Sequence, residues 1–150
     1  MVEPDYWIWG HDAVKPRILH SMIRVANLEK SLEFYCQQLG MNVLSRVDVA
    51  AGKFSIVFVS FGDDYNSGAI ELTHNWEHPA NEAGYTHGSG YGHVAIGVPD
   101  VHETCDRLRA LGIKIEVEPK VLLPGAPALA FIKDPDGYAI ELIQTSRPAP

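Results

Sequence analysis

Short segments in which hydrophobic and polar residues alternate are the first regular feature of the chain. Residues 17–25 alternate in this way, and apolar residues at helical spacing follow them as far as Gly40. The same order returns at His93, where an alternating segment precedes a second helical pattern that ends at Gly112. Alternation is typical of a strand with one buried face, and a spacing of three or four predicts an amphipathic helix. The pattern therefore predicts two copies of one strand-and-helix unit.

Three more strands are predicted in each copy. They are residues 42–50, 53–61 and 69–75 in the first, and 114–117, 128–133 and 138–144 in the second. The short segments at 51–52 and 134–137 have the composition of tight turns. Both alternate sets of residues 53–61 are largely apolar, so we expect this strand to be covered on both faces. The expected fold class is α+β, built from two tandem βαβββ modules.

The repeat also predicts the domain organisation. We expect one domain at 17–145, made of modules 17–76 and 91–145 and a linker at 77–90, with an N-terminal arm at 1–16 and a C-terminal tail at 146–150. The arm contains Trp7 and Trp9, which are too apolar for a free tail. We therefore expect the arm to pack on the domain or on a partner subunit.

A histidine and a glutamate recur at matching places in the two modules. His20 and His93 each precede or begin the first strand, and Glu71 and Glu141 each lie in the tetrapeptide Ala-Ile-Glu-Leu, 51 and 48 residues further on. A single residue of this kind most often fills a polar strand position by chance, but the joint match argues against chance. Imidazole nitrogen and carboxylate oxygen both bind first-row divalent metals, so two of each can fill four positions and leave room for water or substrate.

The other five histidines lack a counterpart in the repeat. They are His11, His74, His78, His87 and His102. We interpret each of them as solvated or structural, because no second ligand accompanies it at a matching place.

Charge and composition narrow the class of partner. The net charge is −7, and the 12 lysines and arginines form no basic run, so nucleic acid is not expected as a partner. No apolar run approaches the roughly 20 residues of a membrane span, and the first residues lack the features of a secretory signal. Cys36 and Cys105 lie in predicted helices and are expected to be small buried thiols without a disulfide, as in the cytoplasm. A small-molecule partner is favoured.

The chain resembles the glyoxalase I family of the vicinal oxygen chelate superfamily over residues 17–145. The resemblance rests on the strings 20–25 (HSMIRV), 34–35 (FY) before 39–41 (LGM), 70–76 (IELTHNW), 91–93 (YGH), 134–138 (DPDGY) and 140–142 (IEL). Many members of the superfamily keep only three metal ligands. A fourth ligand at Glu71, followed by Asn75 and Trp76, is similar to glyoxalase I in particular.

The resemblance implies isomerisation of the methylglyoxal–glutathione hemithioacetal to S-lactoylglutathione. It implies that Glu141 is the catalytic base and that Glu71 serves the opposite face in reprotonation. It also implies that Arg24 and Asn75 bind the γ-glutamyl end of glutathione. Where the family usually offers lysines to the glycine carboxylate, the apolar segment at 119–127 has Lys120 as its only cation, so the resemblance implies Lys120 as the third substrate-binding residue. The thiol is therefore left open between glutathione and another thiol.

The cofactor implied is one divalent metal per site, bound by His20, Glu71, His93 and Glu141. Ni(II) or Co(II) is favoured, because the compact chain resembles the nickel-dependent bacterial branch, and Zn(II) accepts the same ligands. The resemblance further implies a homodimer in which the first module of one subunit faces the second module of its partner, so that each active site lies at the subunit interface.

Two classes of alternative remain open. A metal-dependent dioxygenase of the same fold needs only two histidines and one carboxylate, here His20, His93 and Glu141, and Glu71 argues against it. A binding protein without turnover has no need for all four ligands at matching places.

Overall fold

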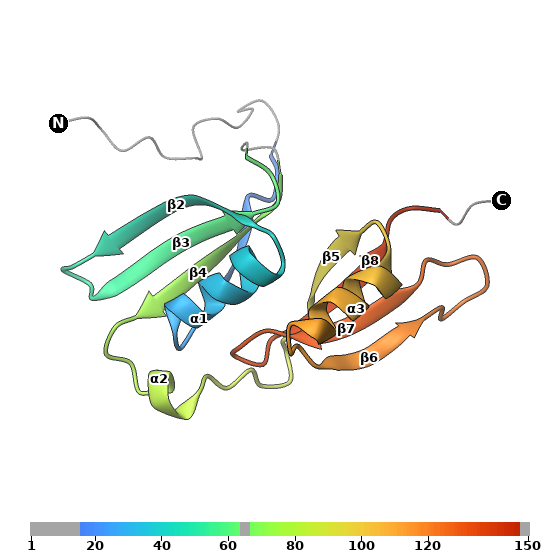
Figure 1. The fold of residues 1–150 in the computed structure, drawn as a ribbon. Coiled ribbons are helices and arrows are strands. Elements are labelled where there is room, and N and C mark those ends of the chain that lie inside the picture. The colour runs from blue at the N-terminus through green and yellow to red at the C-terminus, as the bar shows by residue number, and fades with distance from the viewer. Residues whose placement is uncertain (1–15, 64–66, 148–150) are drawn as a thin grey trace. The chain divides into compact units, whose positions relative to one another are not determined.

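The computed structural model describes residues 16–63 and 67–147 (Figure 1). The expected arm lies outside these residues except for Pro16, and so do Trp7, Trp9 and His11. The last three residues of the expected tail are also outside them. The chain divides into two compact units, Met1–Tyr85 and Thr86–Pro150. Each unit contains one four-stranded sheet.

In the first unit, the strand that comes first in the sequence lies beside the strand that comes last. The elements are β1 (His20–Arg24), α1 (Leu28–Leu32), η2 (Glu33–Gln38), β2 (Asn42–Val49), β3 (Phe54–Ser60), β4 (Ala69–Asn75) and α2 (Ala80–Ala83). The sheet order is β1-β4-β3-β2. β1 runs parallel to β4, and the other neighbours are antiparallel. A parallel neighbour needs a crossover connection, which α1, η2 and the β2–β3 hairpin provide.

The second unit repeats this topology. Its elements are β5 (Val94–Val98), α3 (Val101–Ala110), β6 (Ile115–Lys120), β7 (Leu129–Lys133) and β8 (Ala139–Gln144). The sheet order is β5-β8-β7-β6, and β5 runs parallel to β8. The predicted order βαβββ is therefore present twice, and the α+β fold class is confirmed.

The helix of each unit covers one face of its sheet (Figure 1). Val57 and Leu72 in the first unit, and Leu108 and Leu142 in the second, are all 0% exposed. Both helices begin at a capping side chain, Asn27 in α1 and Asp100 in α3, whose oxygen accepts a backbone N–H three residues on. Gly40 and Gly112 follow the helical segments with φ of 91° and 86°, a conformation that favours glycine.

The first helix differs from the regular α-helix that the spacing predicts for residues 28–39. Only α1 is α-helical, and η2 is a π-helix in which the N–H of Leu39 bonds to the carbonyl of Phe34, five residues back. The wider turn brings neighbouring residues closer to one side of the helix. Phe34 and Tyr35, adjacent in sequence, are 4% and 1% exposed. Burial of both rings therefore accompanies the departure from α-helical spacing.

The expectation that residues 53–61 are covered on both faces is wrong for the single chain. Ser55, Val57 and Val59 are buried beneath the helix, whereas Phe54, Ile56 and Phe58 on the other face are only half-buried. Two smaller differences concern length. β6 runs on to Lys120, beyond the predicted end at 117, and the predicted linker contains the short helix α2.

Both cysteines are free and lie in helical segments, as predicted. Cys105 is buried in α3 and Cys36 is half-buried in η2, and burial raises the pKa of both thiols. In the part of the chain that the structure describes, every helix is too short or too polar to span a lipid bilayer.

Candidate metal centre

The first histidine and the first glutamate lie together because β1 and β4 are parallel neighbours. The register pairs Met22 with Glu71, and His20 lies two residues before Met22 on the same face. The Nε2 atom of His20 is 2.9 Å from Oε2 of Glu71, whose side chain is 15% exposed. Phe58 is the β3 neighbour of Glu71, and its ring lies edge-on to His20 at 5.1 Å between ring centroids. The imidazole and the carboxylate thus meet on a largely apolar face of the sheet.

The second module repeats this arrangement. Nε2 of His93 is 2.7 Å from Oε2 of Glu141, whose side chain is 13% exposed. Phe131 is the β7 neighbour of Glu141 and lies edge-on to His93 at 5.4 Å. Neither Phe58 nor Phe131 was predicted from the sequence as part of the site. The available signal was that each occupies an alternating strand just before the repeated Ala-Ile-Glu-Leu segment.

The two glutamates differ in what holds their second oxygen. The hydroxyl of Thr73 donates to Oε1 of Glu71 over 3.0 Å, and Thr73 is 9% exposed. Ile143 occupies the matching place two residues after Glu141, and an aliphatic side chain has no hydrogen to donate. Glu71 is therefore fixed through both oxygens, while Glu141 lacks a hydroxyl donor at this place.

His93 lies just before β5, where the pairing with β8 begins at Val94. The Tyr91 hydroxyl donates to the carbonyl of Ala139 over 3.2 Å, which joins the segment before His93 to the start of β8. Burial, and secondly the nearby charge of Asp134, raises the pKa of Tyr91, so the phenol keeps the proton that it donates. This bond connects the two segments that carry His93 and Glu141.

The donor atoms of each pair lie at the distance of an N–H···O contact, which is also a distance that two ligands of one metal ion can have. Ligands at adjacent corners of an octahedron lie about 3 Å apart when each bond to the metal is about 2.1 Å. The separations of 2.9 and 2.7 Å are close to that value. Residues 16–63 and 67–147 hold no group of three or more His, Cys, Asp or Glu side chains that could bind a metal. The structure therefore brings the four predicted ligands together as two pairs, one in each unit.

The predicted substrate-binding residues lie on strands. Arg24 is opposite Thr73 in the β1–β4 register, so it shares a face with the His20–Glu71 pair. Asn75 ends β4 on that face, and its amide donates to the Tyr85 hydroxyl over 3.4 Å. In the second unit, Lys120 is exposed at the end of β6.

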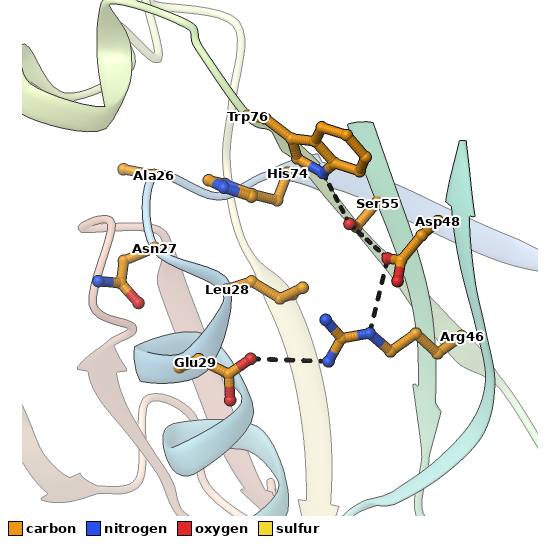
Figure 2. Close-up of a pocket in the computed structure, with 9 residues that line it drawn as sticks. All are labelled: Ala26, Asn27, Leu28, Glu29, Arg46, Asp48, Ser55, His74 and Trp76. Carbon is orange, nitrogen blue, oxygen red and sulfur yellow. Dashed lines mark hydrogen bonds and ion pairs between the residues drawn. The ribbon is translucent and has the colours of Figure 1, made fainter. Parts of the chain in front are cut away.

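A separate pocket of about 380 Å³ lies on the helix side of the first sheet (Figure 2). Trp76 donates through its indole nitrogen to Ser55 over 2.9 Å, and Ser55 donates to Asp48 over 2.6 Å. The guanidinium of Arg46 lies between Asp48 and Glu29, at 3.7 and 3.6 Å. The side chains of Trp76, Ser55, Asp48, Arg46 and Glu29 are thus linked to one another across the pocket. His20 and Glu71 do not line it, so it is distinct from the candidate metal centre.

Three histidines without a counterpart in the repeat have structural contacts, as predicted. His74 lies 3.2 Å from the carbonyl of Val25, and His78 accepts the backbone N–H of Ala80. His87 stacks on Tyr138 with ring centroids 4.2 Å apart.

The chain matches the family model of the Glyoxalase/Bleomycin resistance protein/Dioxygenase superfamily over residues 17–142. It belongs to this superfamily, and the family expected from the sequence is confirmed.

Within this superfamily, the chain is similar to proteins named lactoylglutathione lyase or glyoxalase I. A probable lactoylglutathione lyase from Synechocystis is 49% identical, over 86% of this chain and 95% of that protein. The crystal structure of glyoxalase I from Zea mays is 36% identical with a TM-score of 0.79, over 87% of this chain. This chain spans 45% of the length of the maize chain. A trypanothione-dependent glyoxalase I from Leishmania major is 41% identical with a TM-score of 0.75, over 87% of each chain.

The hydroxyl of Ser55 allows the pocket and the metal centre to be tested separately. Ser55 is 3% exposed, and Ser55→Ala removes the partner of both Trp76 and Asp48. We expect a loss of about 1–3 kcal/mol in the free energy of unfolding, because buried polar groups lose their hydrogen bonds. Urea unfolding measures this loss. Ser45→Ala, on the more exposed neighbouring strand, is the control and should stay within about 0.5 kcal/mol of the wild type. Catalytic activity should not change in either variant, and its loss in folded Ser55→Ala would contradict the separation.

Proposed function

We propose that this chain is a metal-dependent lactoylglutathione lyase, that is, a glyoxalase I, acting in methylglyoxal detoxification. It converts the hemithioacetal of methylglyoxal and glutathione to S-lactoylglutathione. The repeated pair of a histidine Nε2 and a glutamate Oε2 is the observation that carries the proposal. Relatives named lactoylglutathione lyase or glyoxalase I support the same enzyme class, as the sequence predicted. They do not favour a dioxygenase or a binding protein without turnover.

His20, Glu71, His93 and Glu141 together hold one divalent cation. Their nitrogen and oxygen atoms suit Ni(II) or Co(II), which we favour, and also Zn(II). Two carboxylates offset the charge of the cation, so the site accepts a substrate oxyanion without a large excess of charge. When bound, the cation supplies Lewis-acid stabilisation of negative charge on the two neighbouring oxygens of the substrate.

The reaction moves the hydrogen on C1 of the hemithioacetal to C2 as a proton, and the proton of the C1 hydroxyl passes to the oxygen on C2. C1 is thereby oxidised to the thioester and C2 is reduced to the alcohol, so no external oxidant or reductant is needed. Glu141 takes the proton from C1, and Glu71 serves the opposite face when C2 is protonated. General base catalysis of this kind contributes roughly 10² to 10⁴ in rate. Phe58 and Phe131 place each carboxylate beside an apolar ring, where water has less access.

Three polar side chains are proposed to bind the charged groups at the two ends of glutathione. Arg24 and Asn75 bind the γ-glutamyl end of glutathione, since a guanidinium and an amide suit a zwitterionic amino acid. This assignment is supported by the position of both residues on the same face of the sheet as Glu71. Lys120 binds the far carboxylate. The glyoxalase I from Leishmania major is trypanothione-dependent, so the thiol of this chain is best tested with both thiols.

Assembly as a homodimer completes the site. The first module of one subunit contributes His20 and Glu71, and the second module of its partner contributes His93 and Glu141. The half-buried apolar residues Phe54, Ile56 and Phe58 beside Glu71 support this proposal, because such a surface is suited to an interface. We further propose a cytoplasmic location, which the two free cysteines support.

Removal of the metal tests the proposed reaction directly. Chelated protein should form no thioester from methylglyoxal and glutathione, and Ni(II) or Co(II) should restore more activity than Zn(II). The assay follows the absorbance of the thioester product. It is repeated with trypanothione in place of glutathione to identify the preferred thiol. Best rescue by Zn(II) would overturn only the preferred metal. Full activity of the chelated protein would overturn the mechanism.

Replacement of the base separates proton transfer from metal binding. Glu141→Gln should remove most turnover while much of the metal stays bound, because an amide oxygen can still coordinate but cannot take a proton. Kinetics and metal analysis of the same preparation give the two measurements. We expect less than about a tenth of the wild-type activity, given the usual contribution of a general base. Activity above this level would assign the base to another residue.

Mixed dimers test whether the two modules of different subunits share a site. One variant combines His20→Ala with Glu71→Gln, and the other combines His93→Ala with Glu141→Gln. Each is expected to be inactive alone. When the two are unfolded and refolded together, random pairing gives mixed dimers with one intact site, so roughly a quarter of the wild-type activity should return. A mixture that forms dimers but stays inactive would contradict the shared site.

A further inference from the structure

The two proposed carboxylate ligands repeat in sequence and strand register, but the residue two places after each of them differs in its ability to donate a hydrogen bond. Glu71 has Oε2 at 2.9 Å from His20 and receives the Thr73 hydroxyl at Oε1. Glu141 has Oε2 at 2.7 Å from His93, and the aliphatic Ile143 stands where the first module has Thr73. The modules therefore match in the histidine, the glutamate and the phenylalanine, and they differ in the hydroxyl.

Thr73 is well placed to restrict Glu71. It lies two residues further along β4 on the same face, and its side chain is buried in the sheet. A buried hydroxyl that donates to a carboxylate fixes the rotation of that carboxylate and directs its other oxygen. In this structure the other oxygen is Oε2, which faces His20. Thr73 thus holds Glu71 with Oε2 beside His20, the other proposed ligand of the first module.

Ile143 has the opposite consequence for Glu141. It is half-buried and lies beside Leu129 of β7 and Gly97 of β5, neither of which has a side-chain hydrogen-bond donor. A carboxylate without a hydroxyl donor there keeps more freedom to turn towards a substrate carbon.

We propose that Thr73 is a positioning residue that keeps Glu71 in one orientation, as a ligand that serves C2 from a fixed position, and that Ile143 leaves Glu141 free to turn towards C1 as the base. This inference rests on the proposed function. Glu71 and Glu141 occupy matching places in the two modules, and the residue two places after each one explains why their roles differ. Thr73 acts through Glu71 and does not itself contact the reacting atoms.

The first half of the proposal is tested by metal affinity, measured by competition with a chromophoric chelator. Thr73→Val removes the hydroxyl and keeps the shape, and we expect about a threefold to tenfold weaker affinity, as for the loss of one hydrogen bond of ordinary strength. Thr73→Ser keeps a hydroxyl and should return the affinity to within about twofold of the wild type. If Thr73→Val bound the metal as tightly as the wild type, the positioning role of Thr73 would be overturned. Should Thr73→Val not fold, Thr73→Ala is judged by the same criterion.

A control removes an exposed hydroxyl that joins the end of β8 to β5 in the second unit. The Thr145 hydroxyl donates to the carbonyl of Val98 over 3.1 Å, at the far end of β5 from His93. Thr145→Val should leave metal affinity unchanged. An equal loss of affinity in Thr145→Val and Thr73→Val would reduce Thr73 to general support of the sheet and would overturn the proposal. Thermal unfolding of the metal-free proteins establishes that each variant is folded.

The second half is tested by adding the missing hydroxyl. Ile143→Thr gives Glu141 a hydroxyl donor like that of Glu71, so we expect kcat to fall about threefold to tenfold. KM should not change, and the metal affinity should stay the same or increase. An unchanged kcat would overturn this half. If the wild type proves to have no lyase activity, the proposed function fails, but the metal affinity of the Thr73 variants still decides the role of Thr73.

Discussion

Parallel pairing between the first and last strands of each module is the contact on which the rest of the structure depends. It places residues separated by about fifty positions in sequence side by side on one sheet, and it does so twice. Because side chains on a strand alternate between two faces, the register also decides which residues share the face of the site. A shift of one residue in β4 would turn Glu71 towards the helix and leave His20 without its carboxylate.

The two faces of each sheet have separate tasks. One face packs on the helix through fully buried residues such as Leu72 and Leu142, which contribute most of the hydrophobic stabilisation. The other face carries the histidine, the glutamate and a phenylalanine, and in the single chain it is only half-buried around Phe58. Stability and chemistry are thus divided between the faces, which permits the small departures from symmetry at Thr73 and Ile143 that distinguish the two modules.

Much of this was determined by the sequence alone. Alternation, helical spacing and the repeated Ala-Ile-Glu-Leu predicted two βαβββ modules and selected His20, Glu71, His93 and Glu141, because period and residue chemistry are local properties. The ends of the two helical segments at Gly40 and Gly112 were predicted for the same reason, since a glycine stop acts within one turn of the chain.

Only the tertiary structure decided the properties that depend on contacts between distant strands. The edge-on rings of Phe58 and Phe131, and the buried bond from Thr73 to Glu71, follow from register and packing. The π-helix at 33–38 arises where two adjacent aromatic rings are both buried, and periodicity predicted an α-helix there. Sequence identifies which residues have the right chemistry, whereas their separation and orientation depend on strand pairing, which no local pattern specifies.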